Sequence, residues 1–174
     1  MNFMGLMNAR YSVRKYSDRP VEAEKLHKVL EAGRLAPTAG NKQPQRVYVF
    51  QSEAALNKLR GLTRMTYGAP TVLLVCYDDA VSWKSTVATF GEDYEGGEVD
   101  AAIVTTAMML QAAELGLGTI WTRGFDSRAL HAALELPAGE HIVAMLPIGY
   151  AAEDSKPLAW HFERKPLEET VQIL

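Results

Sequence analysis

The chain has 174 residues, 48% of them apolar and 22% charged, which is typical of one globular domain and excludes a disordered or fibrous protein. Eighteen basic and 21 acidic side chains give a net charge of −3, so no general electrostatic field attracts the protein to nucleic acid or to acidic lipid. The lone cysteine excludes an intramolecular disulfide, four scattered histidines exclude a structural zinc site, and the apolar stretch 1–7 is too short to span a bilayer, so we expect a single cytoplasmic domain over 1–174.

The first half of the chain predicts helices alternating with strands. Apolar side chains at three- and four-residue steps predict a helix over 21–35, which ends at the Ala36-Pro37 pair. Residues 46–51 have the β-branched and aromatic content of a strand, and Ser52 is a good N-cap for the helix that follows. Residues 71–77 are apolar on both pleat faces, as in a strand covered by helices on both sides. This pattern indicates a layered α/β sheet.

The segment 80–97 departs from this pattern, because aromatic and acidic side chains are interspersed before a Gly-Gly pair. We expect a mobile segment there, and a lid is one role open to it. Its acidic residues could hold a divalent ion, but beside two glycines they are more typical of a solvated loop. These residues are Glu92, Asp93, Glu95 and Glu98.

The second half predicts a long helix, two strands and a short helix between them. Residues 98–115 are apolar around more than one helical face, so this helix is expected in a core or an interface, with Gly116 as its stop. Residues 119–123 and 141–150 have strand character, and Asp126 or Ser127 caps a helix that ends at Leu134. The tail after residue 156 is too short to fold alone, and we expect it to pack against another surface.

Side chains that could act directly in catalysis are scarce. Cys76 lies inside the buried strand and is interpreted as a small hydrophobe and not as a nucleophile. The Gly116-Leu-Gly118 sequence follows a helix and precedes a strand, which is the reverse of a dinucleotide-binding fingerprint. No phosphate-binding loop, nucleophile elbow or His-Glu-x-x-His motif occurs, so hydrolase and kinase interpretations lose support.

Two segments have the composition of binding loops. Arg10, Ser12 and Arg14 share one side of an extended chain, where two guanidinium groups and a hydroxyl suit a phosphate; a solvated basic edge is the alternative. The loop 36–44 carries neutral donors and acceptors suited to ligand recognition; an ordinary helix-to-strand connection, with Asn41 bonded to its own backbone, is the alternative.

Four motifs resemble, in this order and over nearly the whole chain, those of the nitroreductase family of flavoproteins. They are Arg10-Tyr-Ser-Val-Arg-Lys-Tyr16, Ala36-Pro-Thr-Ala-Gly-Asn-Lys-Gln-Pro44, Asp100 to Ala113 with Leu115-Gly-Leu-Gly-Thr-Ile-Trp121, and Leu146-Pro-Ile-Gly-Tyr150. The resemblance implies an α+β sandwich with a sheet flanked by helices. It also implies a domain-exchanging homodimer that holds one FMN at each of two sites in the interface.

The resemblance also assigns residues to the FMN site. Arg10, Ser12 and Arg164 would hold the phosphate, and Arg14 would approach the pyrimidine side of the ring, where a cation raises the flavin potential. Pro37 and Thr38 would come from the other subunit, while Asn41 and Gln43 would bond the ring edge or the ribityl chain. The backbone N–H groups of 122–124 would meet N5 and O4. The implied set is Arg10, Tyr11, Ser12, Arg14, Pro37, Thr38, Asn41, Gln43, Thr122, Arg123, Gly124 and Arg164.

The chain departs from the family pattern at two places that bear on substrate choice. Gln45 stands where many relatives have an aromatic residue, and the region between Tyr77 and Gly97 is short where relatives can insert a lid. Arg123 occupies a segment that is often neutral, so it could add a contact to a phosphate or carboxylate of the reductant or substrate.

The implied activity is an FMN-dependent oxidoreductase that carries electrons in a ping-pong scheme from NAD(P)H to an electron-poor acceptor such as a nitroaromatic or a quinone. Flavin chemistry needs no acid–base pair from the protein, in keeping with the scarcity of catalytic side chains. The alternatives are a specialised relative that dehydrogenates a substrate, dehalogenates one or cleaves the flavin, and a non-catalytic FMN-binding protein. An interaction module without flavin is a further possibility.

Overall fold

A computed structural model describes residues 2–85 and 94–174. Within them, four antiparallel strands form a sheet in the order β1-β2-β4-β3. The strands are β1 (Gln45–Phe50), β2 (Thr71–Asp78), β3 (Gly118–Thr119) and β4 (Glu140–Gly149). The central pair, β2 and β4, consists mostly of apolar residues, nearly all of them buried, so the core follows these two strands.

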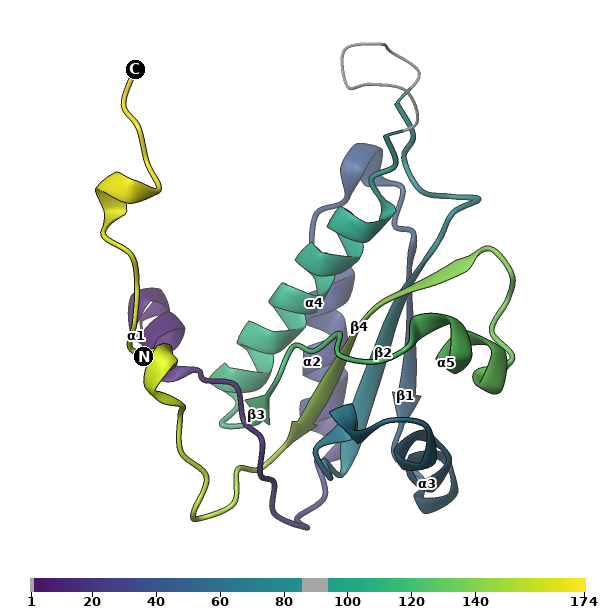
Figure 1. The fold of residues 1–174 in the computed structure, drawn as a ribbon, viewed down its shortest axis with the longest axis horizontal. Helices are drawn as coiled ribbons and strands as arrows, with labels where there is room; N and C mark the ends of the chain where they lie inside the picture. Colours follow the sequence, from purple (N-terminus) through teal and green to yellow (C-terminus); the bar gives the residue numbers. More distant parts are fainter. Residues whose placement is uncertain (1, 86–93) are drawn as a thin grey trace.

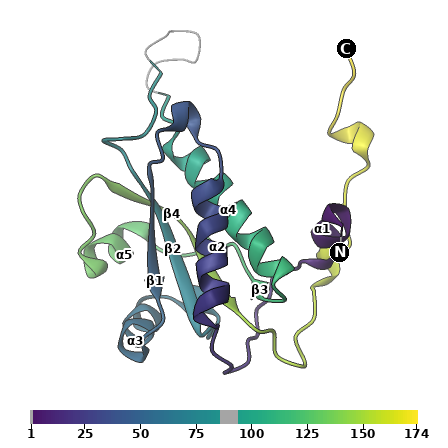
Figure 2. The same ribbon diagram turned by 180° about the vertical axis from the view of Figure 1, so that it is seen from behind.

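Helices cover both faces of the sheet, which confirms the layered arrangement predicted from β2 (Figures 1 and 2). Leu73 and Val75 of β2 pack with α2 (Ala23–Leu35) and α4 (Gly97–Glu114). Val72 and Leu74 point the other way and pack with α3 (Glu53–Leu62) and α5 (Ser127–Leu134). Because successive side chains of a strand alternate between faces, an uninterrupted apolar strand requires a cover on each side.

The ends of the helices follow the capping residues predicted from the sequence. The Ser52 hydroxyl accepts a hydrogen bond from the Ala55 N–H at 3.2 Å and starts α3. The Asp126 carboxylate accepts from two N–H groups of α5, each at 3.0 Å. Gly116 follows α4 with φ +76°, the left-handed conformation typical of the residue after a helix. These local signals therefore place three helix boundaries correctly.

The strand predicted over 119–123 is shorter in the structure, because its partner contains a proline. β3 pairs only Gly118 and Thr119 with β4, and a separate bridge joins Thr122 to Met145. Between them the Ile120 N–H donates to the Pro147 carbonyl at 3.4 Å. Proline has no N–H to return the second bond of that pair, so the ladder is interrupted there.

Two features at the chain ends differ from the sequence prediction. Residues 3–9 form a helix, α1 (Phe3–Ala9), which was not predicted. The tail, which was expected to pack against a surface, extends away from the sheet beside α1 (Figure 1). One contact to α1 is a 3.3 Å separation between His161 Nε2 and the Asn8 carbonyl oxygen. Large apolar side chains of the tail are exposed, among them Trp160, Phe162, Leu167, Ile173 and Leu174.

Residues 86–93, which include Glu92 and Asp93 and the centre of the expected mobile segment, lie outside the described residues. The two arms that lead to them are paired: the Ser85 N–H donates to the Tyr94 carbonyl at 3.0 Å, and the Gly96 N–H donates to the Trp83 carbonyl at 2.8 Å. None of the helices in the described residues combines the length and hydrophobicity needed to cross a bilayer.

We expect Gly118→Ala to lower the free energy of unfolding by about 1–3 kcal/mol, because a Cβ there would lie 2.6 Å from Cγ2 of buried Val13. Gly61→Ala is the matched control, since a Cβ at Gly61 has no atom within 4 Å and alanine favours the helix by about 0.5–1 kcal/mol. Urea denaturation measures both variants. Equal stability of the two would contradict the close packing at Gly118.

Cys76 is fully buried, and burial raises the pKa of its thiol to about 12. The thiolate, which is the reactive form, is therefore rare in the folded protein near neutral pH. We expect 5,5′-dithiobis(2-nitrobenzoate) at pH 8 to label Cys76 only as fast as the protein unfolds, and immediately in 6 M urea. Because the unfolded thiol ionises at lower pH than the folded one, Cys76 also lowers stability as the pH rises from about 9 toward 12. Rapid labelling of the native protein would contradict this burial.

Candidate functional site

The segment that carries Arg10, Ser12 and Arg14 is extended and lies beside β3. Ser12 forms a parallel bridge with Thr119, and the Val13 N–H donates to the Thr119 carbonyl at 2.9 Å. Val13 points inward and is buried, so the residues on either side of it point outward. As the two-residue spacing predicts, the three polar side chains face one space.

That space is a pocket of about 240 Å³, which we call the arginine pocket. It is lined by Arg10, Tyr11, Ser12, Arg14, Leu158, Trp160, His161 and Arg164. Its wall therefore contains three guanidinium groups and a hydroxyl but no carboxylate. In residues 2–85 and 94–174, none of the three arginines forms an ion pair. Three cations without counter-charges make the pocket a site for an anion with several oxygens.

The tail completes the arginine pocket, and two contacts hold the tail in place. The Tyr11 hydroxyl donates to Ser155 Oγ at 3.2 Å, and the Tyr11 ring meets His161 edge-on with the centroids 6.3 Å apart. Arg164 follows on the same segment and donates to its own backbone, to the Glu163 carbonyl at 2.6 Å. The sequence analysis thus placed Arg164 together with Arg10 and Ser12, although more than 150 residues separate them along the chain.

The loop Thr38–Gln43 has an unusual backbone that its own side chains support. Asn41 and Gln43 have φ of +53° and +51°, in the left-handed region that residues other than glycine rarely adopt. Thr38 Oγ1 accepts from the Gln43 N–H at 3.1 Å, and the Gln43 amide donates to Asn41 Oδ1 at 3.2 Å. Such strained backbone is common where a protein grips a ligand. Pro37, Asn41 and Gln43 are exposed.

The extended segment 10–14 and the loop Thr38–Gln43 lie at opposite ends of α4 (Figures 1 and 2). The loop meets the start of this helix, where the Ala39 N–H donates to Asp100 Oδ1 at 2.9 Å. The arginine pocket lies beside Gly118 and Thr119, just after the helix ends. Because α4 has 18 residues, its ends are separated by about 27 Å. One chain therefore does not bring the two halves of the expected site together.

The third expected segment, 122–124, runs from the β3 region toward the start of α4. Thr122 is buried, with its hydroxyl 3.4 Å from Met65 Sδ, and Gly124 lies against the same methionine. Arg123 is exposed and forms an ion pair with Glu98 on α4. The segment thus lies near the loop end of its own chain, and the side chain of Arg123 already has an anionic partner.

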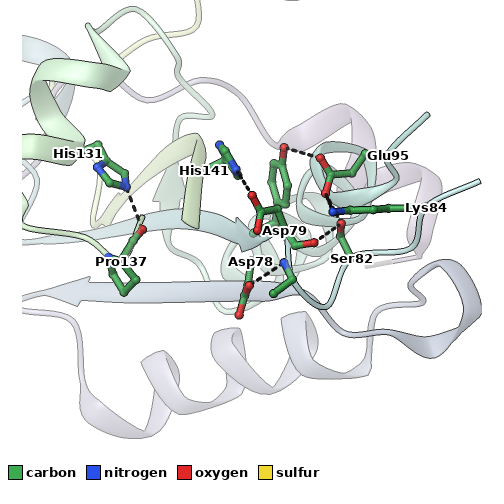
Figure 3. A network of polar contacts seen from close by, with 10 residues as sticks. Asp78, Asp79, Ser82, Lys84, Glu95, His131, Pro137 and His141 are labelled. Atoms are coloured by element: carbon green, nitrogen blue, oxygen red, sulfur yellow. Dashed lines mark hydrogen bonds and ion pairs between the residues drawn. The ribbon is translucent and has the colours of Figure 1, made fainter. Parts of the chain in front are cut away.

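Arg123 also borders a polar cavity of about 440 Å³ that the sequence analysis did not find. Arg128 and His131 of α5 line it, together with Tyr77 and His141 of the sheet. Tyr77 stacks on His141 with the ring centroids 5.0 Å apart, and His141 Nε2 lies 2.9 Å from Asp79 Oδ2 (Figure 3). These residues come from three stretches of the chain, 77–79, 123–131 and β4, and no local pattern groups them.

A second group of polar contacts joins Tyr77 to Glu95, just before α4. The carboxylate of Glu95 accepts from the hydroxyls of Ser82 and Tyr77 and lies near Lys84 (Figure 3). Burial, followed by the charge of Glu95, raises the pKa of Tyr77 to about 12, which keeps this phenol protonated. Among residues 2–85 and 94–174, no group of three or more His, Cys, Asp or Glu side chains could hold a metal ion.

One face of α4 is apolar yet open to solvent in the single chain. Val99 and Ile103 are 49% and 39% exposed, and they line a shallow cavity of about 630 Å³ with Ala102, Thr106 and Ala107. The opposite face, with Val104 and Met108, is buried on the sheet. Its sequence predicts a helix buried in a core or an interface, and within one chain only one face of α4 is covered. Exposed apolar patches of this kind mark interaction surfaces.

Comparison with known proteins identifies the family of this chain. The model of the nitroreductase family matches residues 7–65 and 60–150. A nitroreductase family protein from Clostridium difficile is 39% identical and has a TM-score of 0.90, with 99% of this chain and 98% of that chain covered. An NADH dehydrogenase from Thermus thermophilus is 30% identical over 93% of this chain and 91% of its own.

A nitroreductase structure from Desulfovibrio desulfuricans, in complex with FMN, is 26% identical, with a TM-score of 0.83 over 100% of this chain and 98% of its own. The fold is thus shared with solved proteins along nearly the whole chain. The match in sequence extends through the extended arginine segment, the Thr38–Gln43 loop and α4. This chain is a member of the nitroreductase family.

Proposed function

We propose that the protein is an FMN-dependent NAD(P)H oxidoreductase that works as a homodimer, with nitroaromatics or quinones as electron acceptors. The observation that carries the proposal is the arginine pocket, with three guanidinium groups that have no carboxylate partner within the described residues. FMN ends in a phosphate dianion, and a hydroxyl beside three cations fits that group. Two relatives support the same assignment: the Thermus protein is named an NADH dehydrogenase, and the Desulfovibrio protein was solved in complex with FMN.

The neutral loop fits the other end of FMN. The flavin ring presents carbonyl oxygens and ring nitrogens that need hydrogen bonds but no full counter-charges. The exposed amides of Asn41 and Gln43 can donate and accept such bonds. Since α4 keeps this loop away from the arginine pocket of the same chain, the loop serves the pocket of a partner subunit. The open apolar face of α4 and the exposed tail provide surfaces for that partner.

When bound, FMN supplies the redox chemistry, taking two electrons from a reduced nicotinamide and giving them to an acceptor. The protein contributes binding and electrostatics. Arg10, Ser12 and Arg164 would hold the phosphate, and Arg14, whose guanidinium donates to the Ser12 carbonyl at 3.0 Å, would supply a fixed positive charge to the pyrimidine side of the ring. The backbone N–H groups of Arg123 and Gly124 would provide further neutral donors, whereas the Thr122 N–H already donates to the Met145 carbonyl at 3.0 Å. No side chain needs to act as nucleophile, which agrees with the burial of Cys76.

The shared site is tested with two variants that damage different halves. We expect both double variants, Arg10→Ala/Arg164→Ala and Asn41→Ala/Gln43→Ala, to bind FMN more weakly than the wild type. The arginine variant should lose affinity by roughly a hundredfold, because charge-assisted bonds to the phosphate are lost. A heterodimer of the two, purified with two affinity tags, places both defects in one site and leaves the other intact. FMN titration should therefore find one site of wild-type affinity per heterodimer.

The number of wild-type FMN sites in the heterodimer shows whether the loop serves its own subunit or the partner. Two weak sites in the heterodimer would mean that each subunit binds FMN with its own loop. Wild-type affinity of both parent variants would remove these residues from the site. Sedimentation of the wild-type protein as a monomer would contradict the homodimer.

Turnover is tested by steady-state kinetics of the FMN-loaded protein with NADH and NADPH. If reductant and acceptor use one pocket in turn, double-reciprocal plots at several fixed quinone or nitroaromatic concentrations should be parallel. Intersecting lines would contradict the ping-pong scheme. Persistent inactivity with FMN bound would instead favour a flavin-binding protein, and reoxidation only by another class of acceptor would favour a specialised relative.

A further inference from the structure

Asp100 is a buried carboxylate that connects α4 to the loop Thr38–Gln43. It lies in the first turn of α4 and is 2% exposed. Its Oδ1 atom accepts from the Ala39 N–H at 2.9 Å, across 61 positions of sequence. Its Oδ2 atom is buried and has no hydrogen-bond partner within residues 2–85 and 94–174.

An arrangement of this kind is expensive for the folded state. Removing a carboxylate from water with one oxygen unsatisfied destabilises the folded state, and the positive end of the α4 dipole offsets only part of that cost. The other unsatisfied buried side-chain atom in the described residues is Oε1 of Gln45. Both residues border the same loop: Asp100 bonds the Ala39 N–H, and Gln45 follows Gln43 by two positions. Unsatisfied groups are rare in native proteins, and a pair at one loop points to function more than to stability.

The loop needs a contact that fixes its position relative to α4. Gly40, Asn41 and Gln43 all have φ between +51° and +54°. The hydrogen bonds inside the loop join neighbouring residues and cannot fix its position relative to the helix. The bond from Ala39 to Asp100 does so at the residue just before this left-handed run. Gly40 also packs closely on the Trp83 ring, because a Cβ at this position would lie 3.3 Å from Cδ1 of Trp83. The loop is thus held between that ring and α4.

We propose that Asp100 is a positioning residue for flavin binding: by holding the Ala39 N–H it fixes the backbone that presents Asn41 and Gln43 to the ring. This inference rests on the proposed function. Asp100 contacts no ligand itself and acts only through the loop. If the loop serves the partner subunit, Asp100 sets the FMN affinity of the site built on the partner's arginine pocket.

The test measures FMN affinity and dissociation rate for Asp100→Ala and Asp100→Asn. Loss of the charge-assisted acceptor in Asp100→Ala should weaken FMN binding by about tenfold or more. Asp100→Asn keeps an oxygen acceptor without the charge, so its loss should be smaller. Ser52→Ala is the control, because it also removes a side-chain acceptor of a backbone N–H but lies at the far end of β1. It should lose stability and keep the wild-type affinity.

A double-mutant cycle distinguishes positioning from a general loss of stability. If Asp100 acts through the loop, Asp100→Ala should add little to the defect of Asn41→Ala/Gln43→Ala, because both amides that it positions are already absent. Fold-losses that multiply would overturn the proposal. So would Asp100→Ala with FMN affinity within twofold of the wild type.

Asp100→Asn keeps the proposal testable even if Asp100→Ala does not fold. The amide variant should release FMN faster and take up more deuterium in residues 38–43 than the wild type, with unchanged uptake in α3. Wild-type behaviour in both measurements would overturn the inference while leaving the proposed function intact. Failure of the wild-type protein to bind FMN would overturn both.

Discussion

The apolar character of both faces of β2 is the constraint on which the architecture depends. A strand whose residues alternate between two faces and are all buried must be covered twice, and the chain provides the cover with α2 and α4 on one side and α3 and α5 on the other. The central position of α4 follows from this packing. The arginine segment 10–14 and the loop Thr38–Gln43 are then placed at its two ends.

Because α4 is rigid and long, it acts as a spacer between two chemically different surfaces. Three arginines gather beyond its C-terminal end, and neutral amides gather at its N-terminal end. A ligand with an anionic end and a neutral polar end matches both surfaces, but not within one chain. In the proposed homodimer, a second copy bound to the open apolar face between them would align one set with the other.

The division of labour in the proposed enzyme follows from the side chains available. The lone cysteine is buried, His131, His141 and His161 lie within hydrogen-bond distance of carbonyl or carboxylate oxygens, and the tyrosine beside His141 stays protonated. These groups suit structural roles. The protein instead offers the fixed charges of three arginines, the strained neutral loop Thr38–Gln43 and the buried carboxylate of Asp100. Such groups hold and orient a cofactor that brings its own reactivity.

Sequence by itself determined the elements and much of the local chemistry. Periodicity predicted α2, α4 and the central strands, Ser52 and Asp126 marked helix starts, and two-residue spacing placed Arg10, Ser12 and Arg14 on one side. These features depend on neighbours within a few residues, so local patterns carry them. The family resemblance added Arg164, which no local pattern connects to the others.

Only the tertiary structure decided how those pieces meet. Pro147 shortened the strand at 119–123 because of the residue it faces, and the length of α4 separated the two binding segments. The bond between Asp100 and Ala39 and the cavity around Tyr77 and His141 join segments distant in sequence. Periodicity reveals which face of an element is buried. Register, helix length and packing decide what lies against that face, and these are properties of the folded chain.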